Sequence, residues 1–177
     1  IERDGINELV AFLEKSDFFT APASTRFHCS LPGGLALHSL NVYHMFEHKC
    51  KSEPFKSILG DMPEDSRKII TLLHDVCKTY MYEIDYRNKK IYSDTGSKRD
   101  EKGRFDWAAV EYYTINDRVP YGHGEKSVMM IEEYIKLQPF ERYAIRWHMG
   151  FSEPKENWNT LGTAIEKYPV ILALHQS

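Results

Sequence analysis

The chain has 177 residues, 42% of them hydrophobic, which suits one domain with a single sizeable core. Its net charge of −3 excludes a general basic field for duplex binding, so a nucleic-acid partner is possible but unsupported. The isolated cysteines Cys29, Cys50 and Cys77 form no zinc or redox motif, and no apolar run is long enough to cross a membrane. We therefore expect a reduced, cytoplasmic protein, while the sequence leaves its oligomeric state open.

The first part of the chain predicts three helices. Apolar residues at helical spacing predict a helix over residues 5–15, with Asp4 as its N-cap. A second amphipathic helix is predicted over 35–51, after two glycines, with His38 on the side of the helix that faces the core. Acidic residues followed by an apolar run predict a central, mostly buried helix over 63–79.

The second part of the chain is predicted to change from helix to strand and then back to helix. Tyrosine and isoleucine residues around a charged, glycine-containing tract predict a β-hairpin or ribbon over residues 80–117, with a mobile middle. Helical patterns return over 124–137, over 139–149 and from 161 to the end, where Pro169 bends or interrupts the helix. We therefore predict a mostly α fold, a helical bundle with an inserted ribbon, forming one domain over 1–177.

The tract Thr71-Leu72-Leu73-His74-Asp75-Val76-Cys77-Lys78 places ionisable groups inside a predicted core helix. Burial of such groups is costly unless something pairs with them, and a metal ion against His74 and Asp75 would do so. The ordinary alternative is a buried His-Asp hydrogen bond with the ammonium group of Lys78 reaching solvent.

Three further histidines strengthen the metal interpretation. His38 points at the core, His123 lies between glycines that let the backbone approach something closely, and His148 ends a helix on or beside its apolar face. Each has an ordinary explanation alone, such as a carbonyl partner, a turn or the helix dipole. Together with His74 and Asp75 they favour a shared metal site.

The remaining histidines are weaker candidates. His44 and His48 have the i, i+4 spacing of a chelating pair, but we reject them because they lie on the solvent side of their helix. His28 could reach the site as a substrate-binding residue, and His175 has no identifiable partner.

The segments Gly33-Gly34-Leu35-Ala36-Leu37-His38-Ser39-Leu40 and Leu72-Leu73-His74-Asp75-Val76-Cys77-Lys78 resemble the HD superfamily of metal-dependent phosphohydrolases. The resemblance extends over most of the chain. Tyr121-Gly122-His123-Gly124-Glu125-Lys126-Ser127 and Ile145-Arg146-Trp147-His148-Met149-Gly150 are similar to a small bacterial and phage-associated branch of HD hydrolases.

This resemblance implies an HD-type domain with a metal site. Asp75 would be a bridging carboxylate, His38 and His74 would bind a first ion, and His123 and His148 would serve a second. One or two divalent ions of iron, manganese, cobalt, nickel or zinc suit such ligands. The family's late aspartate would lie just past Ser177, so we expect a domain truncated at its C-terminus; Asp106 and Asp117 are possible substitutes without a matching motif.

The resemblance implies hydrolysis of a phosphomonoester or phosphodiester by a metal-activated water, with a nucleotide-like molecule as the substrate. Asp75 and Lys78 are the expected catalytic residues, with Lys78 also contacting the phosphate beside His28. Basic and tyrosine residues of the ribbon offer further contacts for a phosphate-rich ligand. The alternatives are a catalytically weak HD sensor that binds metal or nucleotide, a nucleic-acid accessory module acting through the ribbon, and a purely structural helical domain.

Overall fold

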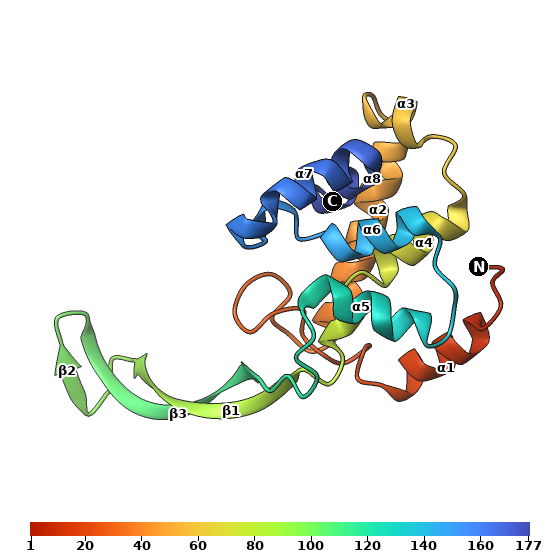
Figure 1. The fold of residues 1–177 in the computed structure, drawn as a ribbon. Coiled ribbons are helices and arrows are strands. Elements are labelled where there is room, and N and C mark those ends of the chain that lie inside the picture. The colour runs from red at the N-terminus through yellow and green to blue at the C-terminus, as the bar shows by residue number, and fades with distance from the viewer.

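A computed structural model describes residues 1–177 as a helical body from which a long β-arm projects (Figure 1). The α-helices, in chain order, are α1 (Ile6–Lys15), α2 (Gly34–Cys50), α3 (Phe55–Leu59), α4 (Glu64–Leu72), α5 (His123–Glu132), α6 (Pro139–Trp147), α7 (Trp158–Lys167) and α8 (Val170–His175). Short 3-10 helices cover Val76–Lys78, Gly150–Ser152 and Lys155–Asn157. No helix combines the length and the apolar character needed to span a membrane.

The body is built around α2, which packs against α4 on one side and α8 on another. Leu35, Val42 and Phe46 of α2 belong to a continuous cluster of 21 buried hydrophobic residues that also takes side chains from α1, α4, α6 and α8. A smaller cluster of Trp147, Leu161, Ala164 and Ile171 fixes α7 to this core. The core therefore holds rigidly the helix ends that carry the candidate histidines.

The arm is a three-stranded antiparallel sheet in the order β1-β3-β2. Strands β1 (Tyr82–Tyr92) and β3 (Gly103–Ile115) pair along their whole length, from Tyr82 with Ile115 to Tyr92 with Phe105. Strand β2 (Lys98–Asp100) pairs with the start of β3 at the tip of the arm. The middle of this segment, predicted to be mobile, thus contains a third strand.

The expected class, a mostly α bundle with an inserted ribbon, is wrong. Helical residues make up 48% of the chain and the sheet another 15%, so the fold is mixed α and β. The physical reason is the length of the arm: β1 and β3 have 11 and 13 residues, longer than most strands, and form a sheet that stands clear of the helices.

Several predicted boundaries also need correction. Helix α4 ends at Leu72, so the predicted helix over 63–79 is wrong beyond that residue, and α5 ends at Glu132 rather than at 137. Helix α1 begins after Gly5 in a left-handed conformation, with no side-chain cap from Asp4. The break at Pro169 is confirmed, because α7 ends at Lys167 and α8 begins at Val170.

Candidate metal centre

The carboxylate of Asp75 lies at the centre of the site, where the chain leaves α4. After Leu72 the backbone turns through His74 and Asp75 before the 3-10 helix Val76–Lys78. A continuous helix would point these two adjacent side chains about 100° apart. The turn instead brings Nε2 of His74 to 3.4 Å from Oδ2 of Asp75.

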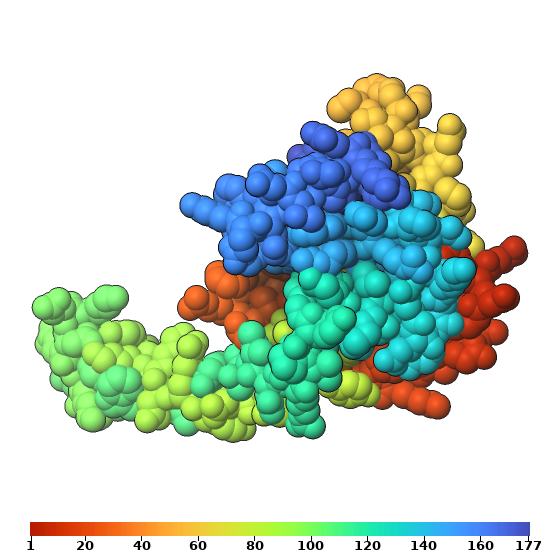
Figure 2. All heavy atoms as spheres, in the orientation of Figure 1, coloured from red at the N-terminus to blue at the C-terminus, as the bar shows by residue number.

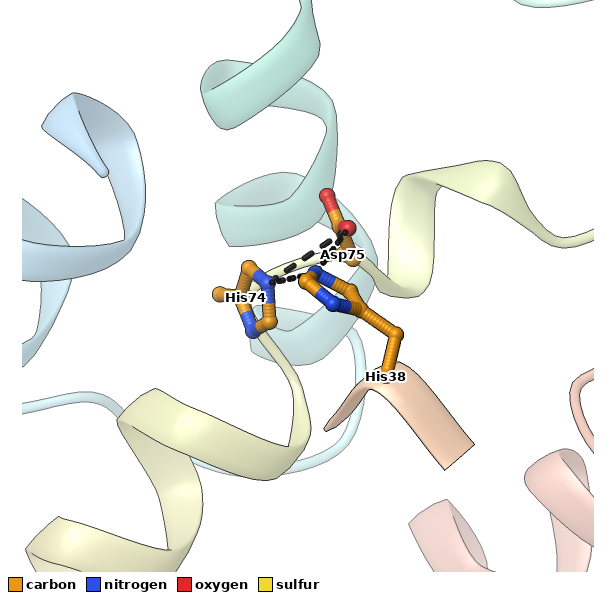
Figure 3. Close-up of side chains that lie close together, drawn as sticks. All are labelled: His38, His74 and Asp75. Carbon is orange, nitrogen blue, oxygen red and sulfur yellow. Dashed lines mark hydrogen bonds and ion pairs between the residues drawn. The ribbon is translucent and has the colours of Figure 1, made fainter. Parts of the chain in front are cut away.

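Four histidines surround this carboxylate, two facing each oxygen. Nε2 of His38 lies 3.3 Å and Nε2 of His74 lies 3.4 Å from Oδ2 (Figure 3). On the other oxygen, Nε2 of His123 lies 2.8 Å and Nε2 of His148 lies 3.4 Å from Oδ1. These five residues form two groups that could hold a metal ion, and both groups include Asp75.

Two of the histidines are oriented by backbone carbonyls at helix ends. Nδ1 of His74 lies 2.8 Å from the Thr71 carbonyl, and Nδ1 of His148 lies 2.6 Å from the Ile145 carbonyl. A carbonyl can only accept, so each Nδ1 is protonated and Nε2 is the nitrogen that each ring can offer to a metal ion. Nε2 of His148 is buried and has no hydrogen-bond partner, which is the arrangement a metal ligand requires.

Glycines allow the segments that carry the site residues to pack closely against their neighbours. A Cβ atom on Gly124 would overlap the Arg146 carbonyl, so only glycine lets α5 approach the end of α6, where His148 lies. At the start of α2, a Cβ atom on Gly34 would overlap the Cys29 carbonyl. The close backbone approach expected from the glycines around His123 is therefore an approach to the residues just before His148.

The charge balance differs between the histidines. Burial lowers the pKa of His148 to about 4 despite its proximity to Asp75, so this ring is neutral near pH 7. Burial also opposes protonation of His123, but its contacts with Asp75 and with the Cys77 thiol raise its pKa to about 10. Burial raises the pKa of Asp75, yet His74 and the other histidines outweigh it and hold that pKa well below the usual range.

The predicted helix would have placed Lys78 one turn beyond His74, on the same side of the helix. In the structure, Lys78 instead contacts Asp75. Its ammonium group donates to Oδ2 of Asp75 at 2.8 Å and to the Ala23 carbonyl at 2.9 Å. His28 is exposed at the rim, with its ring centroid 4.8 Å from that of His38. Burial and the nearby His38 lower the pKa of His28.

A cavity of about 420 Å³ opens onto this cluster. Its wall includes all five clustered residues, His28 and Lys78, together with Tyr82 and Ile115 from the base of the arm. A larger cavity, of about 690 Å³, lies between α5, α6 and α7 and holds none of the candidate histidines.

The sequence did not predict three side chains that contact the site. The Cys77 thiol lies 3.4 Å from Nδ1 of His123, the Tyr82 hydroxyl donates to the Ala23 carbonyl, and Nδ1 of His175 lies 3.0 Å from the His148 carbonyl. Only Cys77 had a sequence signal, since it follows Asp75 by two residues. The other contacts depend on the packing of the arm and of α8.

Other candidates lie apart from the cluster. His44 and His48 are exposed on α2, as expected. Asp117 pairs with Lys126 at 2.6 Å and Asp106 accepts a hydrogen bond from Ser97 in the arm, so neither completes the site. Searches of protein-family models, curated proteins and solved structures found no match to this chain.

Proposed function

We propose that this protein is an HD-type metal-dependent phosphohydrolase. The observation that supports this proposal is the division of one carboxylate between two histidine pairs: His38 and His74 face Oδ2 of Asp75, whereas His123 and His148 face Oδ1. Such a carboxylate is suited to bridge two metal ions, the arrangement expected for clamping both oxygens of a phosphoryl displacement.

The donor set suits one or two divalent transition-metal ions. Imidazole nitrogens with a single carboxylate favour iron, manganese, cobalt, nickel or zinc over magnesium or calcium, which prefer oxygen ligands. Backbone carbonyls hold the Nδ1 nitrogens of His74 and His148, so Nε2 is the nitrogen that each ring can offer to a metal ion. Neutral His148 needs no deprotonation before it binds a metal.

Bound ions would supply a hydroxide nucleophile near neutral pH and neutralise phosphoryl oxygens. The protein's own contribution is to bind and orient the phosphate. The ammonium group of Lys78, fixed between Asp75 and the Ala23 carbonyl, provides positive charge at the cavity wall. His28 offers a hydrogen-bond donor at the rim, beside His38.

The substrate is a phosphomonoester or phosphodiester of nucleotide-like size. The cavity of about 420 Å³ falls within the range of small-molecule sites, and it combines histidines and a lysine with apolar side chains such as Val42 and Leu174. A phosphate attached to a planar organic group matches that combination of charge and apolar surface.

The decisive experiment compares Asp75→Asn with His44→Ala after purification without chelator. His44 is an exposed histidine on the helix that carries His38, so its loss controls for surface histidine binding. We expect about two ions per chain and hydrolysis of bis-p-nitrophenyl phosphate in the wild type and in His44→Ala, and neither in Asp75→Asn. Equal metal content in Asp75→Asn and wild type would contradict the proposal, provided circular dichroism shows the same helix content.

A further inference from the structure

The β-arm carries most of its exposed apolar side chains on one face. Paired residues of an antiparallel sheet point to the same side, so the register assigns Tyr82, Ile84, Tyr86, Trp107 and Ile115 to a single face. We call it the aromatic face; it also includes Tyr92 and Phe105 at the tip. Of the six large apolar side chains of the arm that are strongly exposed, only Ile91 lies on the opposite face.

This exposure is high for side chains of this kind. Tyr86 is 61% exposed, Ile84 57% and Trp107 51%. At roughly 100 Å² of exposed surface each, the aromatic face approaches the 300–600 Å² of the largest patches on ordinary monomers, which are often functional. A ribbon without a second layer is also marginally stable in water. The aromatic face therefore has the character of a binding surface.

The aromatic face is continuous with the candidate metal centre. Tyr82 and Ile115, the pair at the base of the arm, line the cavity that holds His123 and Asp75. The Tyr82 hydroxyl also donates to the Ala23 carbonyl, which Lys78 contacts as well. A long ligand with one end in the cavity would thus leave it along this face. Figure 2 shows the arm projecting beyond the body, with open space beside its outer part.

Charge distinguishes the outer arm from the rest of the molecule. Residues 87–104 contain seven lysines and arginines and three acidic residues, a net charge of +4 in a chain whose total is −3. Arg87, Lys89 and Lys90 belong to β1, an edge strand of the sheet. Lys90 lies on the aromatic face, with its ammonium group 4.3 Å from the centre of the Phe105 ring, whereas Arg87 and Lys89 lie on the opposite face of the same edge strand. A phosphate backbone could run along this basic edge while bases stack on Tyr86 and Trp107.

We propose that the arm binds single-stranded nucleic acid, with successive bases stacked on the aromatic face and one phosphodiester in the cavity. This deepens the proposed function, on which it rests for the reaction, by naming a polymeric substrate. The 11 residues of β1 span about 35 Å, enough for several nucleotides. A dinucleotide would occupy the cavity without reaching Trp107.

The test measures binding of this 177-residue chain to fluorescently labelled single-stranded dT12 in EDTA, where no hydrolysis occurs. Tyr86→Ala and Tyr112→Ala form a matched pair, because each tyrosine donates to a carboxylate on the facing strand, Glu111 or Asp85, but on opposite faces of the arm. We expect Tyr86→Ala to weaken binding about tenfold and Tyr112→Ala to leave it within twofold. Tyr86→Phe should retain binding, since stacking needs the ring and not the hydroxyl.

Two further comparisons separate the possible outcomes. Unlabelled dT2 should compete at least tenfold less well than dT12, and binding should weaken as salt rises. Absence of dT12 binding, or equal loss in both tyrosine variants, would overturn the arm proposal. So would a stable dimer in sedimentation that Tyr86→Ala dissociates, because the face would then be an interface with a second copy.

Failure of this inference can be told apart from failure of the proposed function. Asp75→Asn should lose metal and hydrolysis and should still bind dT12, because its aromatic face is intact. Hydrolysis of bis-p-nitrophenyl phosphate without dT12 binding would refute only the arm proposal. Binding of dT12 by a protein that retains no metal would refute only the hydrolase.

Discussion

The ammonium group of Lys78 lies 2.8 Å from Oδ2 of Asp75, the oxygen that also faces His38 and His74. A metal ion bound by these histidines would share that oxygen with Lys78. Replacing Lys78 with Met should therefore leave metal retention equal or tighter. Hydrolysis of bis-p-nitrophenyl phosphate should fall about 100-fold, the usual effect of losing one donor to a developing charge. Loss of metal together with activity would show that Lys78 only supports the fold of the site.

The two histidine pairs predict separable metal sites. His38→Ala removes a ligand facing Oδ2 of Asp75, whereas His123→Ala removes one facing Oδ1. Each variant should retain about one ion fewer than the wild type by elemental analysis. Double loss in the combined variant would support two sites. Unchanged metal in His123→Ala would reduce the centre to a single ion.

The close approach of α5 to α6 predicts a large effect at Gly124. Alanine normally favours a helix over glycine by about 1 kcal/mol, but here its Cβ would overlap the Arg146 carbonyl. We expect Gly124→Ala to destabilise the protein by about 1–3 kcal/mol and to weaken metal binding, because α5 must move His123 away from Asp75. In α7, Gly162 has no neighbour near its Cβ position, so Gly162→Ala should stabilise slightly. Urea denaturation of both variants measures the contrast.

A buried ion pair far from the histidines predicts a stability effect without a change in metal content. Arg3 donates to both carboxylate oxygens of Glu141, which is fully buried. Arg3→Ala should cost about 3 kcal/mol because it leaves a buried charge without its partner. Lys68→Ala breaks an exposed pair with Glu64 and should leave stability nearly unchanged, because solvent screens that pair. Similar effects in the two variants would contradict this interpretation.

The ion pair between Asp117 and Lys126 leads us to expect a pH-dependent difference in stability between the wild type and Asp117→Asn. Burial raises the pKa of Asp117, but the hydrogen bond from Lys126 and other contacts outweigh this and lower the pKa. A carboxyl group with a lowered folded-state pKa stabilises the protein above its unfolded value near 4, and this contribution disappears as pH falls through the folded value. Asp117→Asn should therefore cost about 2 kcal/mol at pH 7 and progressively less below pH 4. A cost that is constant from pH 7 to pH 3 would show that the ion pair is not its cause.

The sequence predicted the location of most helices because their apolar residues follow helical spacing. It also singled out the five residues that meet around Asp75, since buried polar groups are rare unless they are paired. It did not predict where α4 ends: Ile69, Ile70, Leu72 and Leu73 continue the apolar pattern into the turn. That turn depends on contacts from distant parts of the chain, including the hydrogen bond that the Cys77 backbone amide donates to the Ser127 hydroxyl oxygen.

The fold class was mispredicted for a related reason. The alternation of Tyr82, Ile84 and Tyr86 predicts strands, but it does not say whether a second layer covers them. Met45 illustrates the same limit on α2: helical spacing places it near Val42 on the core side, yet it is 50% exposed while Val42 is buried. Periodicity identifies a face of an element, whereas burial depends on what packs against that face.

The two ends of the arm meet at its base, where the Asn116 amide donates to the Met81 carbonyl at 2.9 Å. The chain thus leaves the helical body and returns to it at nearly one point. Shortening the arm symmetrically, by removing facing pairs from β1 and β3, would preserve this junction and the register of the remaining strands. A graded series of such deletions would measure how many nucleotides of the proposed ligand each length of the arm can bind.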